Sequence, residues 1–138
     1  MRYSRHKLLD IDAVVYKKLA SLNMRERGLM LRTLQKLRRE NSEQALVYFA
    51  ESKGKILGWT LVFYSAQTTH NMHEGWNAFT YIRVGARRQG IGRELVRRVE
   101  ADQSCVWHPW DKQSASFYIE QRESLGDLQC FACPYYYV

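Results

Sequence analysis

The chain has 138 residues, 46% of them apolar, which is enough for one hydrophobic core and short for two, so we expect a single domain over residues 1–138. It contains no apolar run near the roughly 20 residues that span a bilayer. Its N-terminus lacks a signal-peptide pattern, so we expect a soluble, cytoplasmic protein with its three cysteines reduced. The formal charge of +7 favours an anionic partner, which is a nucleic acid, an acidic protein surface or a phosphorylated small molecule.

The first third of the sequence predicts an edge strand and two helices. Residues 2–7 are β-prone, and residues 10–19 combine an acidic N-cap with the apolar spacing of a helix. A second helix is predicted over residues 25–40. Its apolar face is formed by Met30, Leu34 and Leu37. Its other side carries Arg32, Lys36, Arg38 and Arg39, for which a solvated surface is the simpler interpretation.

Three β-prone segments come next and predict antiparallel pairing. Residues 45–50 and 56–64 are joined by a turn that contains Gly54, which is typical of a hairpin. A polar loop over residues 65–75 then leads to a third β-prone segment at residues 76–84.

The remainder predicts a helix from Ile91, a strand at residues 104–108, a helix over residues 112–122 and a β-prone end at residues 128–138. This order predicts an α+β fold with a mixed, mostly antiparallel sheet. The helix from Ile91 then forms a central βαβ crossover between two parallel strands.

Residues 87–95, RRQGIGREL, place two glycines where a strand passes into a helix. The first amides of a helix lack intrahelical partners and attract anions, and Gly90 and Gly92 let the backbone approach a ligand closely. The arginines of the segment add charge-assisted bonds to phosphate. A Walker loop is excluded because it requires Lys and then Ser or Thr after its second glycine, whereas Ile91 and Gly92 follow Gly90. A dinucleotide fingerprint is excluded because Leu95 stands where a small residue is required.

Residues 87–92 fit a six-residue pattern that begins with Arg or Gln, has Gly at its fourth position and ends with Gly or Ala. In this respect they resemble the acyl-CoA-binding motif of the GNAT superfamily of N-acyltransferases. Gly58 falls in the expected strand of that family. Residues 111–118 are similar to a family segment that has Asn at its first position, Ala at its fourth and Phe-Tyr at its end. Phe117 and Tyr118 agree with this segment, whereas Asp111 stands in place of the Asn and Ser114 in place of the Ala.

The resemblance implies acetyl-CoA as co-substrate, with its pyrophosphate on the loop amides and its pantetheine between strands 76–84 and 104–108. The residues implied in binding it are Ile82, Val84, Arg87, Arg88, Gln89, Gly90, Ile91, Gly92, Arg93 and Tyr118.

The resemblance also implies direct attack of an acceptor amine on the thioester. A backbone N–H near Tyr81 or Ile82 is expected to polarise the thioester carbonyl. Tyr118 is expected to protonate the leaving thiolate as general acid, and its alternative is a packed helix tyrosine. The candidate bases are Glu74, His73 and His108, each of which is also interpretable as an ordinary loop residue.

The cysteines do not predict further chemistry. Cys105 has no base nearby in the sequence, and direct transfer needs no acyl-enzyme, so we interpret it as a buried strand residue. Cys130 and Cys133 lack the second ligand pair of a zinc site and are assigned to packing, with no metal expected.

The C-terminal end departs from the family pattern, because only 16 residues follow Arg122 and no Gly-Phe step occurs. We therefore expect an acceptor site that is open, which suits a macromolecular amine, or that a second subunit completes in a homodimer.

Three functions follow from these observations. The first is an acetyl-CoA-dependent N-acetyltransferase acting on an amine of a protein, peptide or small molecule. The second is a GNAT-fold protein that binds a protein partner without turnover. The third is a nucleic-acid-binding protein that uses the basic helix side and the arginines of residues 87–95.

Overall fold

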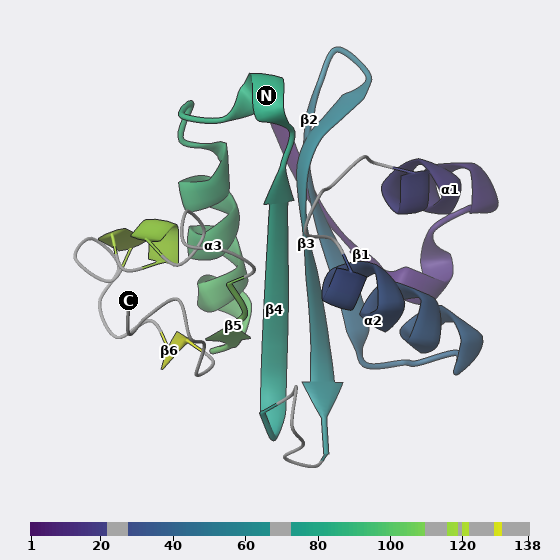
Figure 1. The fold of residues 1–138 in the computed structure, drawn as a ribbon. Helices are drawn as coiled ribbons and strands as arrows, with labels where there is room; N and C mark the ends of the chain where they lie inside the picture. The colour runs from purple at the N-terminus through teal and green to yellow at the C-terminus, as the bar shows by residue number, and fades with distance from the viewer. Residues whose placement is uncertain (22–27, 67–72, 110–115, 119, 122–128, 131–138) are drawn as a thin grey trace.

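The computed structural model describes residues 1–21, 28–66, 73–109, 116–118, 120–121 and 129–130 (Figure 1). Its elements in chain order are β1 (Arg2–Lys7), the 3₁₀ turn η1 (Leu8–Asp10), α1 (Ala13–Ser21), α2 (Gly28–Arg39), β2 (Ala45–Ser52), β3 (Lys55–Ser65), β4 (Gly75–Ile82), the 3₁₀ turn η2 (Val84–Ala86), α3 (Ile91–Asp102), β5 (Val106–Trp107) and β6 (Gln129–Cys130). Within the described residues, no helix has the length and apolar character that crossing a bilayer requires.

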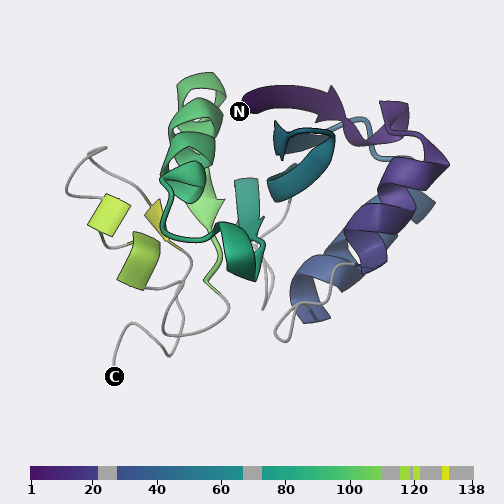
Figure 2. The same ribbon diagram turned by 90° about the horizontal axis from the view of Figure 1, so that it is seen from above.

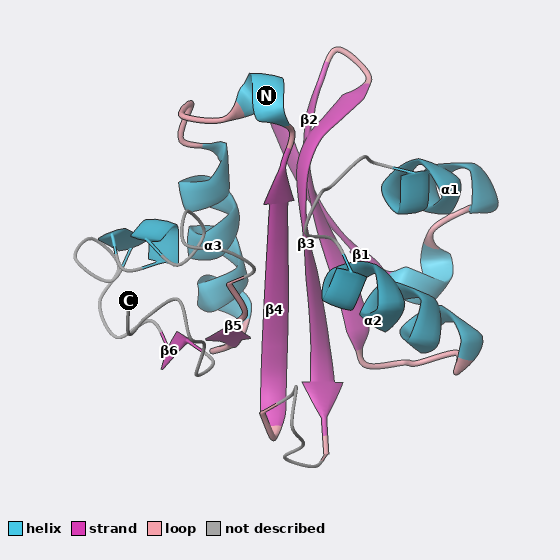
Figure 3. Cartoon of the chain, viewed as in Figure 1, coloured by secondary structure: helices cyan, strands magenta, loops and turns pink. Residues whose placement is uncertain are grey.

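The strands form one six-stranded sheet in the order β1-β2-β3-β4-β5-β6. The first four strands pair antiparallel with their neighbours, whereas the β4–β5 and β5–β6 pairs are parallel (Figure 3). Since α3 joins β4 to its parallel neighbour β5, it is the predicted βαβ crossover. The prediction of a mixed, mostly antiparallel α+β fold is confirmed.

Different helices cover the two faces of the sheet: α1 and α2 lie on one side and α3 lies on the other (Figure 2). The core on the α1/α2 face includes Leu19, Met30, Leu34, Leu37, Val47, Trp59, Leu61 and Phe79. The core on the α3 face includes Val62, Ala78, Leu95, Val96, Val99, Trp107 and Tyr118. The predicted apolar face of the second helix is therefore the buried one.

Local sequence signals explain where several elements begin and turn. The Val15 N–H donates to Oδ1 of Asp12 at 2.9 Å, so Asp12 caps α1. In the β2–β3 hairpin, Lys53 and Gly54 have positive φ values of 51° and 78°, which a two-residue turn that matches the strand twist requires.

The predicted boundaries are less accurate beyond β3. The strand predicted over residues 76–84 ends at Ile82, because the chain enters the η2 turn at Val84. The strand predicted over residues 104–108 is paired only as Val106–Trp107. Of the predicted helix over 112–122, the described residues 116–118 and 120–121 are helical. Of the β-prone end, Gln129–Cys130 forms β6, and residues 131–138 lie outside the described residues.

Candidate functional site

The glycine loop, defined here as residues 87–93, joins the β4 end of the sheet to α3. Gly90 is the N-cap of α3 with a left-handed φ of 79°, and no side chain in the described part of the chain caps the helix. A Cβ built on Gly90 would have no heavy atom within 4 Å. The first N–H groups of α3 have no partner within the helix, and the space beside Gly90 is open among the described residues, a combination typical of an anion site at a helix N-terminus.

The arginines of the glycine loop have different surroundings. The Nε of Arg87 donates to the carbonyl oxygen of Ile82 at 3.0 Å, so this side chain ties the loop to the end of β4. Arg88 adopts a positive φ of 64°, a conformation that costs about 1–2 kcal/mol for a residue with a Cβ. Arg88 and Arg93 are exposed on the loop, where they add positive charge beside the free amides.

Gly92 lies where α3 packs against the segment that follows β5. A Cβ at Gly92 would stand 3.0 Å from Cζ of Phe117 and 3.6 Å from Cγ1 of Ile82. Gly58 of β3 is equally confined, because its Cβ would stand 2.6 Å from Cδ1 of Ile82 and 3.1 Å from the Tyr81 carbonyl oxygen. The glycine loop and the Phe-Tyr segment, which are distant in the sequence, are therefore in contact.

The edge of β4 that faces β5 is only partly paired. Among the described residues the ladder consists of Asn77 with Val106 and Ala78 with Trp107, and its last bond runs from the His108 N–H to the Ala78 oxygen at 3.0 Å. Along a strand the backbone groups of successive residues point to opposite neighbours. Since the Arg83 N–H donates to Leu57 of β3, the backbone of Ile82 faces the β5 side. Of the two expected thioester contacts, Ile82 directs its N–H into this gap, and Tyr81 directs its N–H toward β3.

His108 lies at the point where β4 and β5 part, on the α1/α2 face of the sheet. Its ring stacks on Phe79, with 4.7 Å between the ring centroids, and its Nε2 lies 2.8 Å from Oδ1 of Asn77. Only 3% of His108 is exposed. Burial, and secondarily the nearby His73, lowers the pKa of His108 to about 4, so the ring is neutral at physiological pH.

Tyr118 is buried on the α3 face of the sheet. Its ring packs against Trp107 and Phe117, with centroid distances of 5.6 Å and 5.2 Å. Because Phe117 touches the first turn of α3 at Gly92, Tyr118 is held beside the glycine loop. A packed tyrosine and a general acid are both compatible with this position.

Glu74 and His73 lie at the far end of β4. Both are exposed, and they precede the first residue of the strand. At about 3.3 Å per residue, the eight residues from Glu74 to Ile82 span roughly 25 Å. His108 continues the register beside Phe79, which is only about 10 Å along the strand from Ile82. The structure therefore does not bring Glu74 to the gap at the end of β4, whereas it brings His108 near it.

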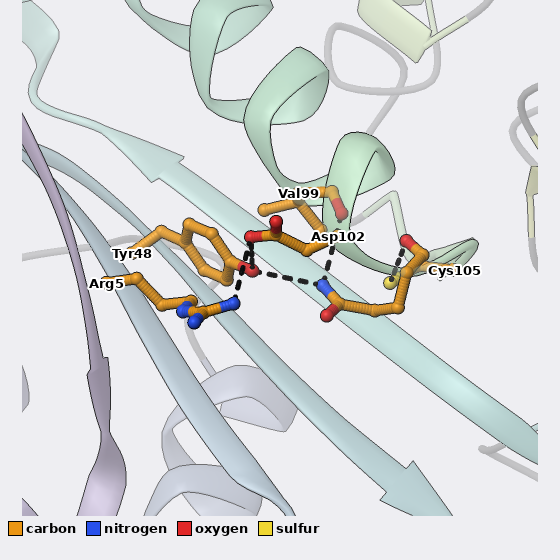
Figure 4. Close-up of polar contacts among 6 residues, drawn as sticks. Arg5, Tyr48, Val99, Asp102 and Cys105 are labelled. Atoms are coloured by element: carbon orange, nitrogen blue, oxygen red, sulfur yellow. Dashed lines mark hydrogen bonds and ion pairs between the residues drawn. The ribbon is translucent and has the colours of Figure 1, made fainter.

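A second polar cluster holds the C-terminal end of α3 to β1 and β2 (Figure 4). The Tyr48 hydroxyl donates to Asp102 at 2.6 Å, and Arg5 forms an ion pair with the same carboxylate at 3.3 Å. Burial, and secondarily the bond to Asp102, raises the pKa of Tyr48 to about 12. A cavity of about 290 Å³ adjoins this cluster. Asp102 is the last residue of α3 and Gly90 caps its first turn, so the cluster belongs to the opposite end of the helix from the glycine loop.

Cys105 is buried near this cluster, and its thiol donates to the Gln103 carbonyl oxygen at 3.7 Å. Burial, with the charge of Glu100, raises the pKa of Cys105. A buried thiol that stays protonated is a poor nucleophile, which agrees with the packing role predicted for it. Cys133 lies outside the described residues.

The basic side of α2 is partly engaged in the fold. The guanidinium of Arg38 donates to the Ile11 carbonyl oxygen at 3.1 Å and lies 4.6 Å above the ring of Tyr16. Arg38 therefore stabilises the packing of α1 on α2. This contact reduces the basic surface that α2 offers to a nucleic acid.

Sequence reasoning did not select Asn77, although the structure makes it the direct partner of His108. An Asn within a β-prone segment is a weak signal, because Asn is depleted in strands. Nothing along the chain indicates that its partner lies 31 residues away.

An α+β sheet with a parallel crossover and a glycine at the N-cap of the crossover helix is the architecture that we expected of an acyl-CoA-dependent acyltransferase. Residues 13–121 match the model of the Acetyltransferase (GNAT) family, and the chain belongs to this family. Its members use acetyl-CoA as co-substrate. A search of curated protein sequences found no significant match.

Solved structures with the same fold include several acetyltransferases. The aminoglycoside 6'-N-acetyltransferase AAC(6')-IG from Acinetobacter haemolyticus is 14% identical, with a TM-score of 0.59 over 96% of this chain and 94% of that chain. The aminoglycoside N-acetyltransferase AAC(6')-Iy in complex with CoA is 9% identical, with a TM-score of 0.57 over 96% of each chain. A probable acetyltransferase is 17% identical, with a TM-score of 0.60 over 91% of this chain and 89% of that chain. These likenesses concern the fold.

Proposed function

We propose that the protein transfers an acetyl group from acetyl-CoA directly to an acceptor amine. The observation that carries the proposal is that, among the described residues, no side chain caps α3 at Gly90 and the pairing of β4 with β5 stops at Ala78. The first feature suits a pyrophosphate, and the second leaves room for an extended pantetheine to add to the sheet. Acetyl-CoA supplies the activated thioester for this reaction.

The glycine loop fits the phosphate end of the co-substrate. The missing Cβ of Gly90 leaves space at the free amides of Ile91 and Gly92, and the positive charges of Arg88 and Arg93 lie on the same loop. Val84 is 72% exposed beside this loop, and we assign its backbone to continue the contact with the pantetheine.

We assign the polarising donor to the part of β4 beyond Ala78, which is not paired with any described residue of β5. Thr80 and Ile82 direct their N–H groups toward the gap, because their parity matches that of Ala78. A fixed N–H that donates to the thioester oxygen stabilises the charge that develops there during attack. Ile82 is the nearer of the two residues to the glycine loop and is assigned this role.

Tyr118 is assigned as the general acid. Its ring packs on the α3 face of the sheet, next to Phe117, which lies against the first turn of α3, and this position supports the assignment. A tyrosine hydroxyl donates readily to a thiolate and keeps the leaving group from reversing the reaction.

His108 is assigned as the proton acceptor in preference to Glu74. Its neutral ring is assigned to take up the proton that the amine nitrogen loses as it attacks. Glu74 lies too far along β4 from Ile82 to take the proton directly from an amine bound at the gap.

The proposal is tested by the release of coenzyme A thiol from acetyl-CoA in the presence of a panel of amines. The panel includes aminoglycosides, because two of the structures with the same fold are named aminoglycoside N-acetyltransferases, together with peptides that carry a free N-terminus or a lysine, and polyamines. Amine-dependent thiol release with a matching acetylated product supports the proposal. Tight acetyl-CoA binding without release for any amine would instead favour a GNAT-fold protein that binds a protein partner.

A further inference from the structure

β1 is the outermost strand at one side of the sheet, and only one of its two edges is paired. It pairs with β2, and no other described strand lies next to it. In Figure 2 it lies at the end of the row of strands, beside the label of the N-terminus. The outer edge of such a strand presents backbone N–H and C=O groups that can pair with another chain. This edge of β1 is therefore a place where another molecule can add a strand.

The register of the sheet determines which groups of β1 point outward. The Tyr64 N–H donates to the Gln44 oxygen at 3.0 Å, so the backbone of Gln44 faces β3. The register is regular here and the backbones of successive residues face opposite neighbours, so Val47 faces β1, where it is paired with His6. His6 therefore faces β2. The same alternation along β1 directs outward the backbone groups of Tyr3, Arg5 and Lys7.

The side chains of Tyr3 and Arg5 connect this edge to a cavity. They lie on the same face of the sheet, because their positions differ by two. Both line the cavity of about 290 Å³ that β1 and β2 form with α3. From β1, Arg5 reaches the carboxylate of Asp102 at the end of α3 (Figure 4). A strand added to β1 would place its own side chains beside this cavity, since the Cβ atoms of directly opposite residues are about 5 Å apart.

The walls of the cavity carry an excess of positive charge. Arg97 and Arg98 both bond the carboxylate of Glu94, at 2.6 Å and 2.9 Å. The side chains of Arg5 and Arg97 remain 55% and 54% exposed in spite of their ion pairs. Three guanidinium groups therefore share the carboxylates of two residues, and the exposed Lys7 adds a further positive charge at the edge. An anionic group is the ligand that such a surface attracts.

The sequence of β1 decides between the possible occupants of its edge. Residues 2–7, RYSRHK, contain no acidic residue. The β1 strand of a second copy would therefore set like charges opposite each other, which destabilises a strand pair. A nucleic acid would meet the positive charge, but it lacks the repeating N–H and C=O groups that pair with a strand edge. An acidic peptide satisfies both features.

We infer that the outer edge of β1 binds an extended acidic segment of a partner protein as an added strand, with a carboxylate of that segment in the cavity beside Arg5. The docking surface consists of the outward backbone groups of β1 and the walls of the cavity. The inference does not depend on the proposed acetyl transfer, because the groups that bind the segment are not those assigned to the reaction.

The test uses the full chain and a fluorescent hexapeptide that alternates valine and glutamate, and it measures binding by fluorescence anisotropy. A second probe has glutamine in place of each glutamate. We expect the acidic probe to bind and the glutamine probe to bind at least about tenfold more weakly, because bonds to charged groups are the stronger ones. Absence of binding by the acidic probe, or equal binding of the two probes, would overturn the inference.

Lys7 provides a backbone test with matched charge. Its φ of −67° and ψ of 139° already suit proline. Lys7→Pro and Lys7→Gln both remove the side-chain charge, but only Lys7→Pro also removes the outward N–H. We expect the acidic probe to bind Lys7→Pro about threefold more weakly than Lys7→Gln, which is the effect of one hydrogen bond. Equal affinities would mean that charge alone attracts the probe, and would overturn strand addition.

N-methylated probes put the same question to the wild type, whatever the stability of Lys7→Pro. Successive residues of an added strand alternate between facing β1 and facing away from it. Methylation at the valine nitrogens and methylation at the glutamate nitrogens therefore remove different bonds. We expect one of the two methylated probes to lose binding and the other to keep it. Equal affinities of the two would overturn strand addition.

Arg5→Gln and Arg39→Gln locate the site, because each removes one exposed positive charge, from β1 and from α2 respectively. We expect about tenfold weaker binding of the acidic probe to Arg5→Gln and no change in Arg39→Gln. Equal effects would overturn the assignment to β1. Tighter binding of an oligothymidine than of the acidic probe would identify a nucleic-acid surface, and a wild-type dimer that Lys7→Pro dissociates would identify a second copy as the occupant. Either result would overturn the inference.

Discussion

Gly92 and Phe117 are in contact: a Cβ on Gly92 would lie 3.0 Å from Cζ of the Phe117 ring. Gly92 lies in the first turn of α3, and the rest of α3 and β5 separate it from Phe117 in the sequence. Their contact sets how closely the first turn of α3 approaches the segment that carries Tyr118. The second glycine of the loop is therefore explained by packing, whereas the first is explained by its φ angle and the space before it.

Gly92→Ala is expected to lower the free energy of unfolding by about 1 kcal/mol. The overlap with Phe117, typically about 1–3 kcal/mol for an overpacked site, exceeds the roughly 1 kcal/mol that Ala gains over Gly in a helix. Chemical denaturation measures the change. Gly85→Ala is the control, because a Cβ at Gly85 has no heavy atom within 4 Å, and it should leave stability nearly unchanged. Equal stability of the two variants would show that the Gly92–Phe117 contact is not close.

Tyr118→Phe is expected to lower kcat about 100-fold, the usual size of a general-acid contribution, while acetyl-CoA affinity stays within a factor of two. The ring and its packing on Trp107 are kept, and only the hydroxyl is lost. Steady-state kinetics and calorimetry separate the two effects. Tyr48→Phe, which removes a buried hydroxyl bonded to Asp102, serves as the control and should keep kcat. An unchanged kcat in Tyr118→Phe would leave Tyr118 as a packing residue.

The stability of the protein should fall as the pH drops from about 6.5 to about 4 because of His108. Its pKa is lowered from 6.5 to about 4 in the fold, so the unfolded chain binds a proton in this window and the folded chain does not. The contribution is fully present above pH 6.5 and is lost as the pH falls toward the folded pKa. At about 1.4 kcal/mol per pKa unit, it amounts to at most roughly 3 kcal/mol.

Denaturation of the wild type and of His108→Gln across this pH range isolates the effect, because other acidic groups such as Glu100 titrate alike in both. The difference between the two proteins should shrink steadily toward pH 4. A difference that is constant with pH would contradict the buried, neutral state of His108.

Cys105→Ala should retain the rate of acetyl transfer, since burial keeps the thiol protonated and no step requires it. Residue-resolved mass spectrometry after treatment with iodoacetamide should find Cys105 unmodified in the native protein and modified after unfolding. Rapid native labelling of Cys105, together with loss of transfer in the variant, would restore a nucleophilic role.

Much of the fold was predictable because its signals are local. The apolar spacing of Met30 and Leu34 predicts the buried side of α2, and Gly54 predicts the β2–β3 turn. The length of β5 was overestimated, since a strand was predicted over residues 104–108 and only Val106–Trp107 pairs with β4. The length of a strand depends on its pairing as well as on β propensity.

The site was predictable only in part. The spacing of Gly90 and Gly92 in one short segment predicts an anion site, whereas the packing of Gly92 against Phe117 has no signal in the sequence. The Asn77–His108 pair, the contact of Arg38 with Ile11, and the confinement of Gly58 by Ile82 depend on residues brought together by the sheet. Such pairs leave no periodic pattern in the sequence.

The most direct test of the account is a calorimetric titration of acetyl-CoA into the wild type, Gly90→Ala and Gly54→Ala. Gly90 and Gly54 have φ values of 79° and 78°, and neither has a heavy atom within 4 Å of a built Cβ, so an added methyl imposes the same backbone strain at both. Only Gly90 lies at the α3 amides. We predict binding by the wild type and Gly54→Ala and a loss of at least tenfold in affinity for Gly90→Ala. Absence of binding by the wild type, or equal affinity of all three proteins, would contradict the assignment of the glycine loop to acetyl-CoA.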